Sequence, residues 1–362
     1  MSYKTIQLSK AADIIVGFPF ASEKFNINAQ GTRLVRGKNI TTGNLRWGDD
    51  TRWWDDSSID LSKYMLKADD IVIGMDGSLV GKNYAKISEN DLPLLLVQRV
   101  ACIRAKEGYD QRFLWGCIAS GKFERYIDSI KTGTSIPHIS GGQIGNYLIP
   151  DFDLPTQKKI AAILSALDEK IAINREINDN LQQQAASIFA EWLNTCTDFS
   201  TIGDMAHNIL DYSPVGSEQI RLLNSSDVTE GVFPIAPLVP NKDLKGHFKK
   251  RFKFGDILYS EIRPRNHHYG FVLFDASDYI ASTRLMVIRA IENKVSPAML
   301  YQYLLLPEVE AEFTLKTESR SGTFPQGNYA DMASIQVPYS PTNSQTAVSE
   351  ILSRIRFAIA QN

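Results

Sequence analysis

The sequence predicts an α+β protein: two similar, mostly β domains separated by a long antiparallel coiled-coil helix pair, whose central helix is long and whose C-terminal helix is short. Three observations predict it. They are an internal repeat, a stretch from Thr156 to Leu193 without Gly or Pro, and a shorter echo of that stretch at the end of the chain. We expect the first domain over residues 1–152, the central helix over 153–196, the second domain over 197–340 and the C-terminal helix over 341–362.

The composition is that of a folded protein. The chain has 362 residues, of which 43% are hydrophobic and 22% charged, so global disorder is not expected. It carries no basic-then-apolar leader and no apolar run approaching the ~20 residues of a membrane span, so we expect a cytoplasmic protein. Its three cysteines lack CxxC spacing, which favours buried thiols in a reducing compartment. The net charge of −2 does not exclude nucleic acid, because local clusters of Lys and Arg decide phosphate binding.

Similar blocks occur twice in the same order, about 188 residues apart, which indicates a tandem duplication. "TRLVRGKNITTGNL" matches "IRLLNSSDVTEGVF", placing Arg33 over Arg221, and "KADDIVIG" matches "KFGDILYS", placing Asp70 over Asp256. "VACIRA" matches "LMVIRA", and "KTGTSIP" matches "ESRSGTFP". Finally, "TQKKIAAILSALDEKIAI" matches "SQTAVSEILSRIRFAIA". The chain is therefore expected to hold one β-rich domain and one helix, each present twice.

Each copy reads mainly as short strands. "DIVIG", "LLLVQRVACIRA", "GDILYS" and "YGFVLF" are β-branched and aromatic runs between Gly, Pro, Asn and Asp. Short helices are expected around "YDQRFLWGCIASGKFERYID" and "SPAMLYQYLLLPEVEAEF". The segment "IPDFDLPTQKK" ends the first copy, and Thr156 after Pro155 is the expected N-cap of the central helix.

The central helix has the 4, 3, 4, 3 spacing of a coiled-coil seam, with two polar layers at its centre. Buried Asn in such a seam fixes its register. The terminal helix supplies a second seam, so we expect the two helices to pair and to dock other subunits. The seam residues are Ile160, Leu164, Leu167, Ile171, Asn174, Asn178, Leu181, Ile188 and Trp192 in the central helix, and Val348, Leu352, Ile355 and Ile359 in the terminal helix.

At ~1.5 Å per residue the central helix would be roughly 57 Å long, enough to hold two domains apart. The alternative is an ordinary core helix within one domain. The terminal helix is about half as long as its counterpart. Either it is naturally short, or the chain is truncated and part of the central seam is left for another subunit.

These segments resemble the specificity subunits of type I restriction-modification systems. The resemblance is carried by "GFPFASEKFN", "RLVRGKNI", "DDIVIGMDGS", "TGTSIPHIS" and above all "LIPDFDLPTQKKIAAILSALDEKI". It covers essentially the whole chain in the order of that family: target-recognition domain, conserved helix, second target-recognition domain, conserved helix. The chain departs from the pattern in its short terminal helix and in the looser second signature, "VPYSPTNSQTAV".

The resemblance implies a non-catalytic subunit that reads a bipartite site in double-stranded DNA, one half-site per domain. It implies two partner modification subunits that carry S-adenosylmethionine and methylate adenine. Restriction subunits, which are motor nucleases using ATP and Mg²⁺, would join to cut unmodified DNA. No cofactor and no membrane are expected for this chain itself.

Motifs of catalysis are missing from the sequence, which agrees with that implication. There is no Asn/Asp-Pro-Pro-aromatic signature, no GxxxxGK[ST] phosphate loop and no HExxH. "GSLVGKN" at Gly77 is one residue short of a phosphate loop and is interpreted as a hairpin tip. His267 and His268 are adjacent, so on a strand they would face opposite sides, and we expect no metal site there.

DNA contacts are expected from basic residues interleaved with aromatic and amide side chains. For each of them the alternative is a solvated residue whose stem covers apolar surface. Arg33 and Arg221 are weaker candidates, because they fall within strand-like text. In the first copy the candidates are Lys24, Arg46, Arg52, Trp53, Lys82, Asn83, Tyr84, Lys131 and Thr132; in the second they are Lys245, His247, Lys249, Arg263, Arg265, Asn266, His267, His268, Tyr269 and Arg320.

Two other functions stay open at this point. One is an assembly scaffold, in which the coiled coil carries the function and the β domains bind protein. The other is a methyltransferase fused to its own recognition domain. The basic and aromatic loop content of both copies favours DNA recognition over both, and the bases that would be read do not follow from the sequence.

Overall fold

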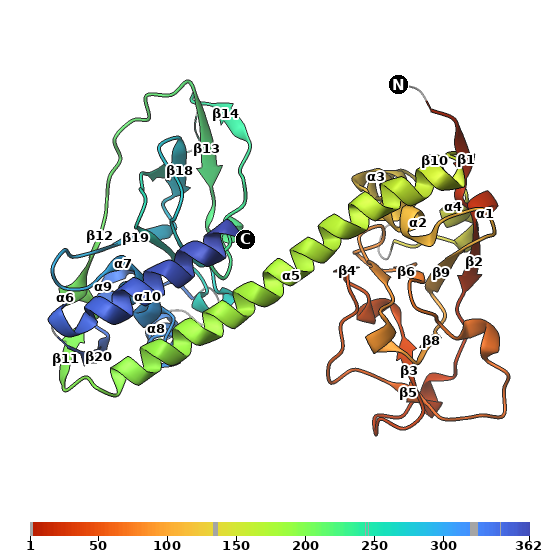
Figure 1. Cartoon of the computed structure of the whole chain (residues 1–362), viewed down its shortest axis with the longest axis horizontal. Coiled ribbons are helices and arrows are strands. Elements are labelled where there is room, and N and C mark those ends of the chain that lie inside the picture. The colour runs from red at the N-terminus through yellow and green to blue at the C-terminus, as the bar shows by residue number, and fades with distance from the viewer. Residues whose placement is uncertain (1–2, 133–136, 243, 245, 319–324, 341) are drawn as a thin grey trace. The chain divides into compact units, whose positions relative to one another are not determined.

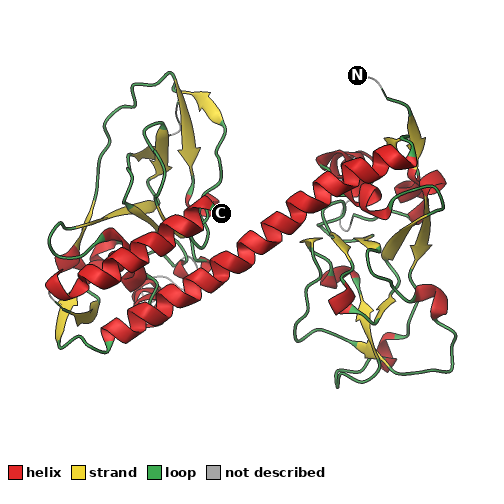
Figure 2. Cartoon of the chain, in the orientation of Figure 1, coloured by secondary structure: helices red, strands yellow, loops and turns green. Residues whose placement is uncertain are grey.

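The computed structural model describes residues 3–132, 137–242, 244, 246–318, 325–340 and 342–362, with only the backbone described for 342–344. The chain divides into two compact units, Met1–Ile171 and Ala172–Asn362, and the division falls within one long helix, α5 (Leu154–Leu193). Each unit is a small α+β body in which helices cover sheets (Figures 1 and 2). No helix in the described parts of the chain is long and apolar enough to cross a membrane.

Unit 1 is built around a five-stranded sheet of order β2-β9-β6-β7-β4, beside a three-stranded sheet of order β5-β3-β8 and the antiparallel pair β1-β10. Its strands are β1 (Thr5–Gln7), β2 (Ala12–Val16), β3 (Thr32–Val35), β4 (Thr42–Gly43), β5 (Trp53–Trp54), β6 (Ile71–Gly74), β7 (Tyr84–Lys86), β8 (Leu94–Leu96), β9 (Val100–Ala105) and β10 (Leu148–Pro150). Its helices are α1 (Leu8–Ala11), η1 (Ser22–Lys24), η2 (Gly37–Asn39), η3 (Ser62–Tyr64), η4 (Glu89–Asp91), α2 (Gln111–Ile118), α3 (Gly121–Ile130) and α4 (Gly141–Gly145), with the start of α5.

Unit 2 has sheets of order β12-β19-β16-β17 and β14-β13-β18-β15, and the antiparallel pair β11-β20. Its strands are β11 (Asp198–Thr201), β12 (Ala206–Asn208), β13 (Gln219–Leu223), β14 (Leu238–Pro240), β15 (Phe248–Lys250), β16 (Ile257–Ser260), β17 (Tyr269–Phe271), β18 (Tyr279–Ser282), β19 (Leu285–Ala290) and β20 (Gln336–Tyr339). Its helices are the end of α5, α6 (Ile202–Met205), η5 (Ser225–Asp227), η6 (Pro264–Asn266), α7 (Pro297–Leu304), α8 (Pro307–Glu318), α9 (Tyr329–Ala333) and α10 (Thr342–Gln361).

The predicted repeat is confirmed, and both copies contain the same hydrogen-bonded ion pair. In unit 1, Asp70 binds Arg104 through two bonds, from Nε at 2.9 Å and from Nη2 at 2.6 Å. In unit 2, Asp256 binds Arg289 in the same way, at 2.6 and 2.8 Å. Both carboxylates are buried just before a core strand, β6 or β16, and both arginines lie near the end of β9 or β19. The duplication therefore preserved the ion pair together with the sheet that surrounds it.

The N-cap of α5 differs from the prediction. The helix begins at Leu154, and the Asp153 carboxylate accepts the backbone N–H of Thr156 at 3.1 Å. Asp153 therefore occupies the capping position expected for Thr156. A carboxylate there satisfies a free N–H and also favours the positive end of the helix, and Pro155 is tolerated in the first turn because its missing N–H would have no intrahelical partner.

The paired part of α5 and α10 lies wholly within unit 2, where the two helices run side by side and antiparallel (Figure 1). Trp192 and Leu352 are buried in one core cluster, and Val348 and Ile355 pack against it. Leu181, Ile188 and Ile359 are half-buried. At the other end, Asn174 and Asn178 donate to the backbone carbonyls of Asn362 and Ile359, at 2.6 and 3.4 Å. The two polar layers thus cap the end of α10.

α10 covers only part of the seam that the sequence predicts in α5. Ile160 is half-buried against the core of unit 1. Leu164, Leu167 and Ile171 are 39%, 54% and 50% exposed, and they precede Asn174, where α5 contacts Asn362, the residue that follows α10. The interpretation of "GSLVGKN" is confirmed, since the segment turns between the antiparallel strands β6 and β7. The three cysteines form no disulfide.

Candidate nucleic-acid interface

Each unit carries a polar hairpin tip that forms an ion pair with the neighbouring helix at the same point of the repeat. In unit 1, Lys82 at the β6–β7 tip pairs with Glu124 of α3, with Nζ and Oε1 3.1 Å apart. In unit 2, His267 at the β16–β17 tip pairs with Glu310 of α8, with Nε2 and Oε1 2.8 Å apart. Both cations stand two residues before the second strand of the hairpin, so the structure places two predicted site residues at equivalent points of the repeat.

The tip in unit 1 gathers further polar groups. Asp76 pairs with Arg99 at 3.2 Å and forms an isolated β-bridge with His138. The hydroxyl of Thr132 lies 3.1 Å from Nε2 of His138, which brings this predicted residue to the tip. The neighbouring Lys131 pairs with Asp128 at 2.7 Å.

Arg46 lies in a separate loop of unit 1. Its side chain is exposed and makes no ion pair with the described residues. It is therefore the predicted cation of this unit that is most available to a phosphate or a base.

Some predicted residues of the first copy serve the fold of unit 1 itself. Asn83 is 4% exposed, and with its amide turned so that the nitrogen faces acceptors, it donates to the backbone oxygens of Leu79 at 2.8 Å and Gly74 at 3.3 Å. As a DNA contact it is therefore a wrong prediction, since its amide already holds the hairpin tip together. The Arg52 guanidinium donates to the carbonyls of Asp49 and Thr51, which stabilises its own turn.

Three more predicted residues of unit 1 contact their own neighbours: Lys24, Trp53 and Tyr84. Lys24 is exposed and pairs with Asp56 at 3.4 Å. Trp53 is half-buried in β5, opposite Arg33 of β3. The ring of Tyr84 packs edge-on against Trp115, with centroids 5.7 Å apart. These aromatic side chains support the sheets beneath the loops.

The tip in unit 2 has a strained backbone and an exposed basic surface. Arg263 and His267 flank the 3-10 helix η6 with φ angles of 45° and 53°, in the left-handed region that non-glycine residues seldom occupy. Arg265 and Asn266 project from this turn and are exposed. Arg265 pairs with Glu318 at 3.1 Å, but its side chain is 71% exposed, so this contact leaves its charge accessible.

His267 lies between two carboxylates. Its Nδ1 is 3.1 Å from Glu230 and its Nε2 is 2.8 Å from Glu310. A neutral imidazole has only one N–H, so both contacts are favourable only when the ring is protonated. Accordingly, the hydrogen bond to Glu230, with a smaller contribution from Glu310, raises the pKa of His267 above its usual value.

The next two residues point into unit 2. Nδ1 of His268 donates to the carbonyl of Val228 at 2.8 Å. Tyr269 stacks on Tyr259, and burial raises its pKa. Adjacent His267 and His268 precede β17 and have different partners. No group of three or more His, Cys, Asp or Glu suited to a metal ion occurs among the described residues.

The basic run in β15 is split by the alternation of the strand. His247 and Lys249 are exposed, and the ring of His247 lies 4.3 Å from that of Phe248. Lys250 points inward, where its Nζ donates to the carbonyl of Leu285 at 2.8 Å and burial lowers its pKa. The candidates Lys245 and Arg320 lie outside the residues that the structure describes.

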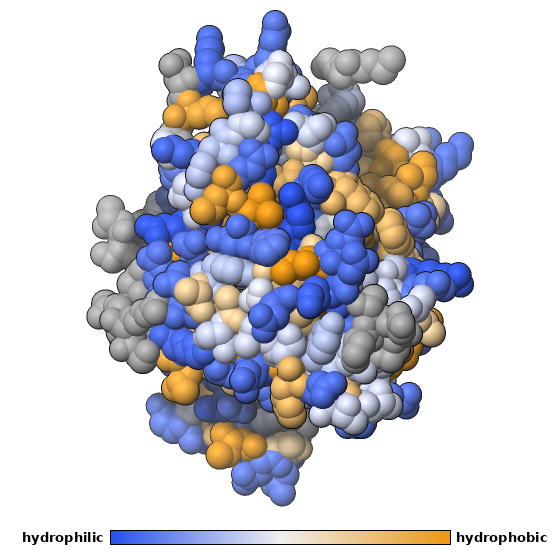
Figure 3. Space-filling model, turned by 90° about the vertical axis from the view of Figure 1, so that its left-hand side faces the viewer, coloured by the Kyte–Doolittle hydropathy of each residue, from blue (hydrophilic) through white to orange (hydrophobic). Residues whose placement is uncertain are grey.

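Hydrophilic residues cover much of the face shown in Figure 3, with small hydrophobic patches between them. Sequence reasoning missed Arg99, which is 68% exposed beside the unit 1 tip. Its place in "QRVACIRA", next to a core strand, gave no signal of exposure. The weaker candidates Arg33 and Arg221 are structural: Arg33 donates to the carbonyl of Asp91, and Arg221 to the carboxylate of Asp278.

The sequence of this chain is similar to those of known proteins. The model of the type I restriction modification DNA specificity domain matches residues 19–183 and 235–361. The HindI specificity subunit of Haemophilus influenzae is 35% identical over 165 residues, which cover 45% of this chain and 36% of that protein. The EcoAI specificity subunit of Escherichia coli is 36% identical over 170 residues, which cover 46% of this chain and 28% of that protein.

A solved structure shares the fold over nearly the whole chain. The crystal structure of a type I restriction-modification S subunit from M. genitalium aligns with a TM-score of 0.60 and 15% identity, covering 99% of this chain and 91% of that one. The sequence matches to the curated relatives span much less, about a third of their length.

Proposed function

The chain belongs to the type I restriction modification DNA specificity family, and on that premise we propose that each of its two units reads one half of a bipartite site in double-stranded DNA. The role is recognition, with methylation and cleavage carried by partner subunits. The expected partners are modification subunits, which would bring S-adenosylmethionine, and restriction subunits, which would use ATP and Mg²⁺.

One observation carries this proposal: the two units share a scaffold but expose different residues at the same place on it. The Asp–Arg ion pair and the attachment of the hairpin tip to a helix occur in both units. Between these fixed points, unit 1 carries "GSLVG" and unit 2 carries "RPRN". A duplicated frame with divergent polar tips is suited to reading two different half-sites, because side chains at the tip can change without disturbing the frame.

We also propose that α5 sets the separation between the half-sites and docks partner subunits. The helix is continuous over 40 residues, with Ala161 in a core cluster of unit 1 and Phe189 in a core cluster of unit 2. Between these points Leu167, Ile171 and Ile173 are at least half exposed. Exposed apolar residues on one helix favour a protein partner.

A reciprocal pair of substitutions tests the proposal. Arg46→Ala in unit 1 and Arg265→Ala in unit 2 each remove an exposed cation with no role in a core. Each should weaken binding, by about tenfold for a lost bidentate base contact, and relax the sequence preference of one half-site only. Binding is measured for the complete complex on DNA libraries randomised in either half-site, at several salt concentrations.

Arg46→Ala should relax the sequence preference only at the half-site read by unit 1, and Arg265→Ala only at the half-site read by unit 2. An equal loss at both half-sites for either variant would contradict the assignment of one half-site to each unit. A complex that makes no bipartite footprint would favour the protein-binding scaffold instead. Methyl transfer by the chain alone would favour the fused methyltransferase.

A further inference from the structure

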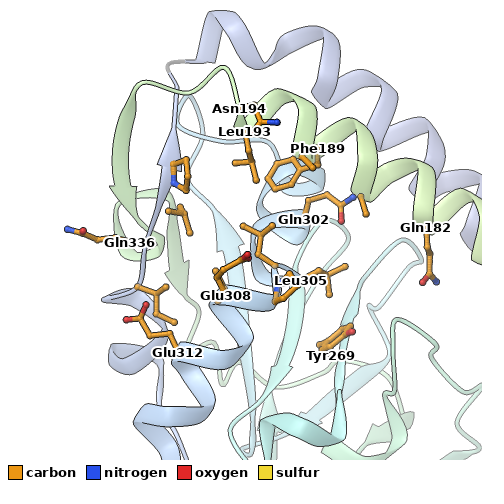
Figure 4. Close-up of a pocket in the computed structure, with 18 of the residues that line it drawn as sticks. Gln182, Phe189, Leu193, Asn194, Tyr269, Gln302, Leu305, Glu308, Glu312 and Gln336 are labelled. Atoms are coloured by element: carbon orange, nitrogen blue, oxygen red, sulfur yellow. The ribbon is translucent and has the colours of Figure 1, made fainter.

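Unit 2 contains a cavity of about 750 Å³ between the end of α5 and helix α8 (Figure 4). This size is typical of cavities that hold drug-sized ligands. Phe189 and Leu193 of α5 form one wall, and Leu305 and Val309 form another. Arg263 and Arg265 are not among the residues that line the cavity, although Tyr269, which follows the same hairpin tip, is.

A buried cation without a carboxylate partner borders this cavity. Arg356 of α10 is 6% exposed and makes no ion pair with the described residues. Its Nη2 donates to Oε1 of Gln302 at 2.8 Å, and its guanidinium lies over the ring of Tyr301, 4.7 Å from the ring centre. Its Nε has no hydrogen-bond partner. A desolvated charge is unfavourable unless an opposite charge or enough acceptors replace the lost water.

Gln302 of α7 presents a second unused donor. It is 4% exposed, and because its oxygen faces Arg356, its Nε2 is left without an acceptor. Gln302 and Arg356 both line the cavity. Two buried side chains from different helices thus supply N–H groups and positive charge, and neither supplies a free acceptor.

The remaining lining residues restrict the charge and shape of a ligand. Glu308 and Glu312 of α8 stand on one side of the cavity (Figure 4), and Glu312 pairs with Lys316 at 2.9 Å. These carboxylates disfavour a ligand with two negative charges, such as a phosphate monoester. The apolar walls favour a hydrocarbon body.

From these contacts we propose that the cavity binds a single carboxylate carried on an apolar body, with Arg356 and Gln302 donating hydrogen bonds to its oxygens. The carboxylate can come from a small organic acid or from an acidic residue or chain terminus of a protein partner. The site is independent of DNA reading, so its failure would leave the proposed function untouched.

Phenylbutyrate and its neutral amide are the probes, and binding to the full chain is measured by isothermal titration calorimetry. Phenylbutyrate should bind, and phenylbutyramide should bind more weakly by about tenfold or more, because it lacks the charge that Arg356 requires. Arg356→Met keeps the length of the stem and should abolish the preference for the acid. Arg354→Met is the matched control, because Arg354 is exposed on the same helix, and it should leave the affinity unchanged.

Gln302→Glu provides a test that does not depend on the ligand. The new carboxylate would stand where Gln302 Oε1 now meets Arg356, so it should compensate the buried charge, raise the melting temperature by about 2–4 °C and abolish binding of phenylbutyrate. If Arg356 needs no anion, burying a glutamate there should lower the melting temperature instead.

The source of the carboxylate is distinguished by repeating the titration on the complex with partner subunits. A site that no longer takes phenylbutyrate in the complex, but takes it in the isolated chain, is filled by a partner's carboxylate. A site that binds phenylbutyrate both in the isolated chain and in the complex is a site for a small organic acid. Equal binding of acid and amide, or binding unaffected by Arg356→Met, would overturn the proposal.

Discussion

At the scale of single residues, the ion pairs shared by the two units are of two kinds, one around a buried carboxylate and one at the surface. Asp70 and Asp256 are buried and hold the strands of each unit together through the half-buried Arg104 and Arg289. Lys82 is more exposed and ties a hairpin tip to a helix. The sequence shows the difference only partly: Asp70 and Asp256 align in the repeat, but nothing in the pattern marks Lys82 as the partner of Glu124.

The buried pair should matter for stability far more than a surface pair. Asp70→Asn leaves Arg104 without its counter-charge and should lower the free energy of unfolding by about 3 kcal/mol. Asp128→Asn is the matched control. It removes an exposed partner of Lys131 and should change the free energy of unfolding little. Urea denaturation followed by tryptophan fluorescence reports mainly on unit 1, which holds four of the five tryptophans, Trp47, Trp53, Trp54 and Trp115. Similar losses for both variants would contradict the structural role of Asp70.

His267 makes the stability of unit 2 depend on pH. Its pKa is raised in the folded chain by Glu230 and Glu310, so the stabilisation is fully present below the unfolded pKa and is lost as pH rises through the folded pKa. Between about pH 6 and about pH 9 the free energy of unfolding should therefore fall. His267→Gln, which does not titrate, should remove the part of this fall that belongs to His267.

The comparison is made by urea denaturation at both pH values. His207→Gln is the control, because His207 is exposed on β12 and has no ion pair with the described residues. An unchanged pH profile for His267→Gln would show that the two carboxylates do not hold a protonated ring.

At the scale of elements, the heptad spacing predicted the paired helices but not how far they pair. The spacing shows which side of α5 is apolar, and it is the same before and after Asn174. Whether that side is covered depends on where the partner helix ends in space, and Asn362 contacts Asn174 and Asn178. The spacing alone predicts that Asn174 and Asn178 fix the register, whereas in the structure their amides cap the end of α10. The N-cap was misplaced for a similar reason, since Asp153 and Thr156 both suit that position.

Two leucines of the predicted seam, one in each helix, should respond differently to truncation. Leu352 is fully buried, so Leu352→Ala should cost about 2–5 kcal/mol of stability. Leu167 is 54% exposed, so Leu167→Ala should cost less than about 0.5 kcal/mol. Under the docking proposal, Leu167→Ala should instead weaken assembly with modification subunits, measured by analytical ultracentrifugation. Full assembly by Leu167→Asp, a harsher change at the same site, would contradict docking on this part of α5.

At the scale of the whole molecule, the duplication explains why so much of the fold could be predicted. A repeat preserves hydrophobic pattern and paired residues together, so the sequence predicts two β-rich domains and the long helix that follows each of them. The interface was less predictable, because charge at a loop does not reveal whether a side chain faces solvent or a neighbour. Arg46 and Arg265 are exposed as predicted, Asn83 is buried, and Arg99 was missed.

The proposal that α5 sets the spacing of the half-sites predicts the effect of lengthening it. Seven residues inserted after Lys170 add about 10 Å of helix and nearly two whole turns, so the rest of the helix almost keeps its orientation. At about 3.4 Å per base pair, the preferred DNA spacer should lengthen by ~3 base pairs while both half-sites stay the same. Selection from libraries with variable spacers measures this. The same insertion after Ser57, in an exposed loop of unit 1, is the control and should leave the spacer unchanged. If the insertion in α5 left the preferred spacer unaltered, α5 would not set the distance between the half-sites. Changes in the hairpin tips alone could not compensate for about 10 Å of added helix.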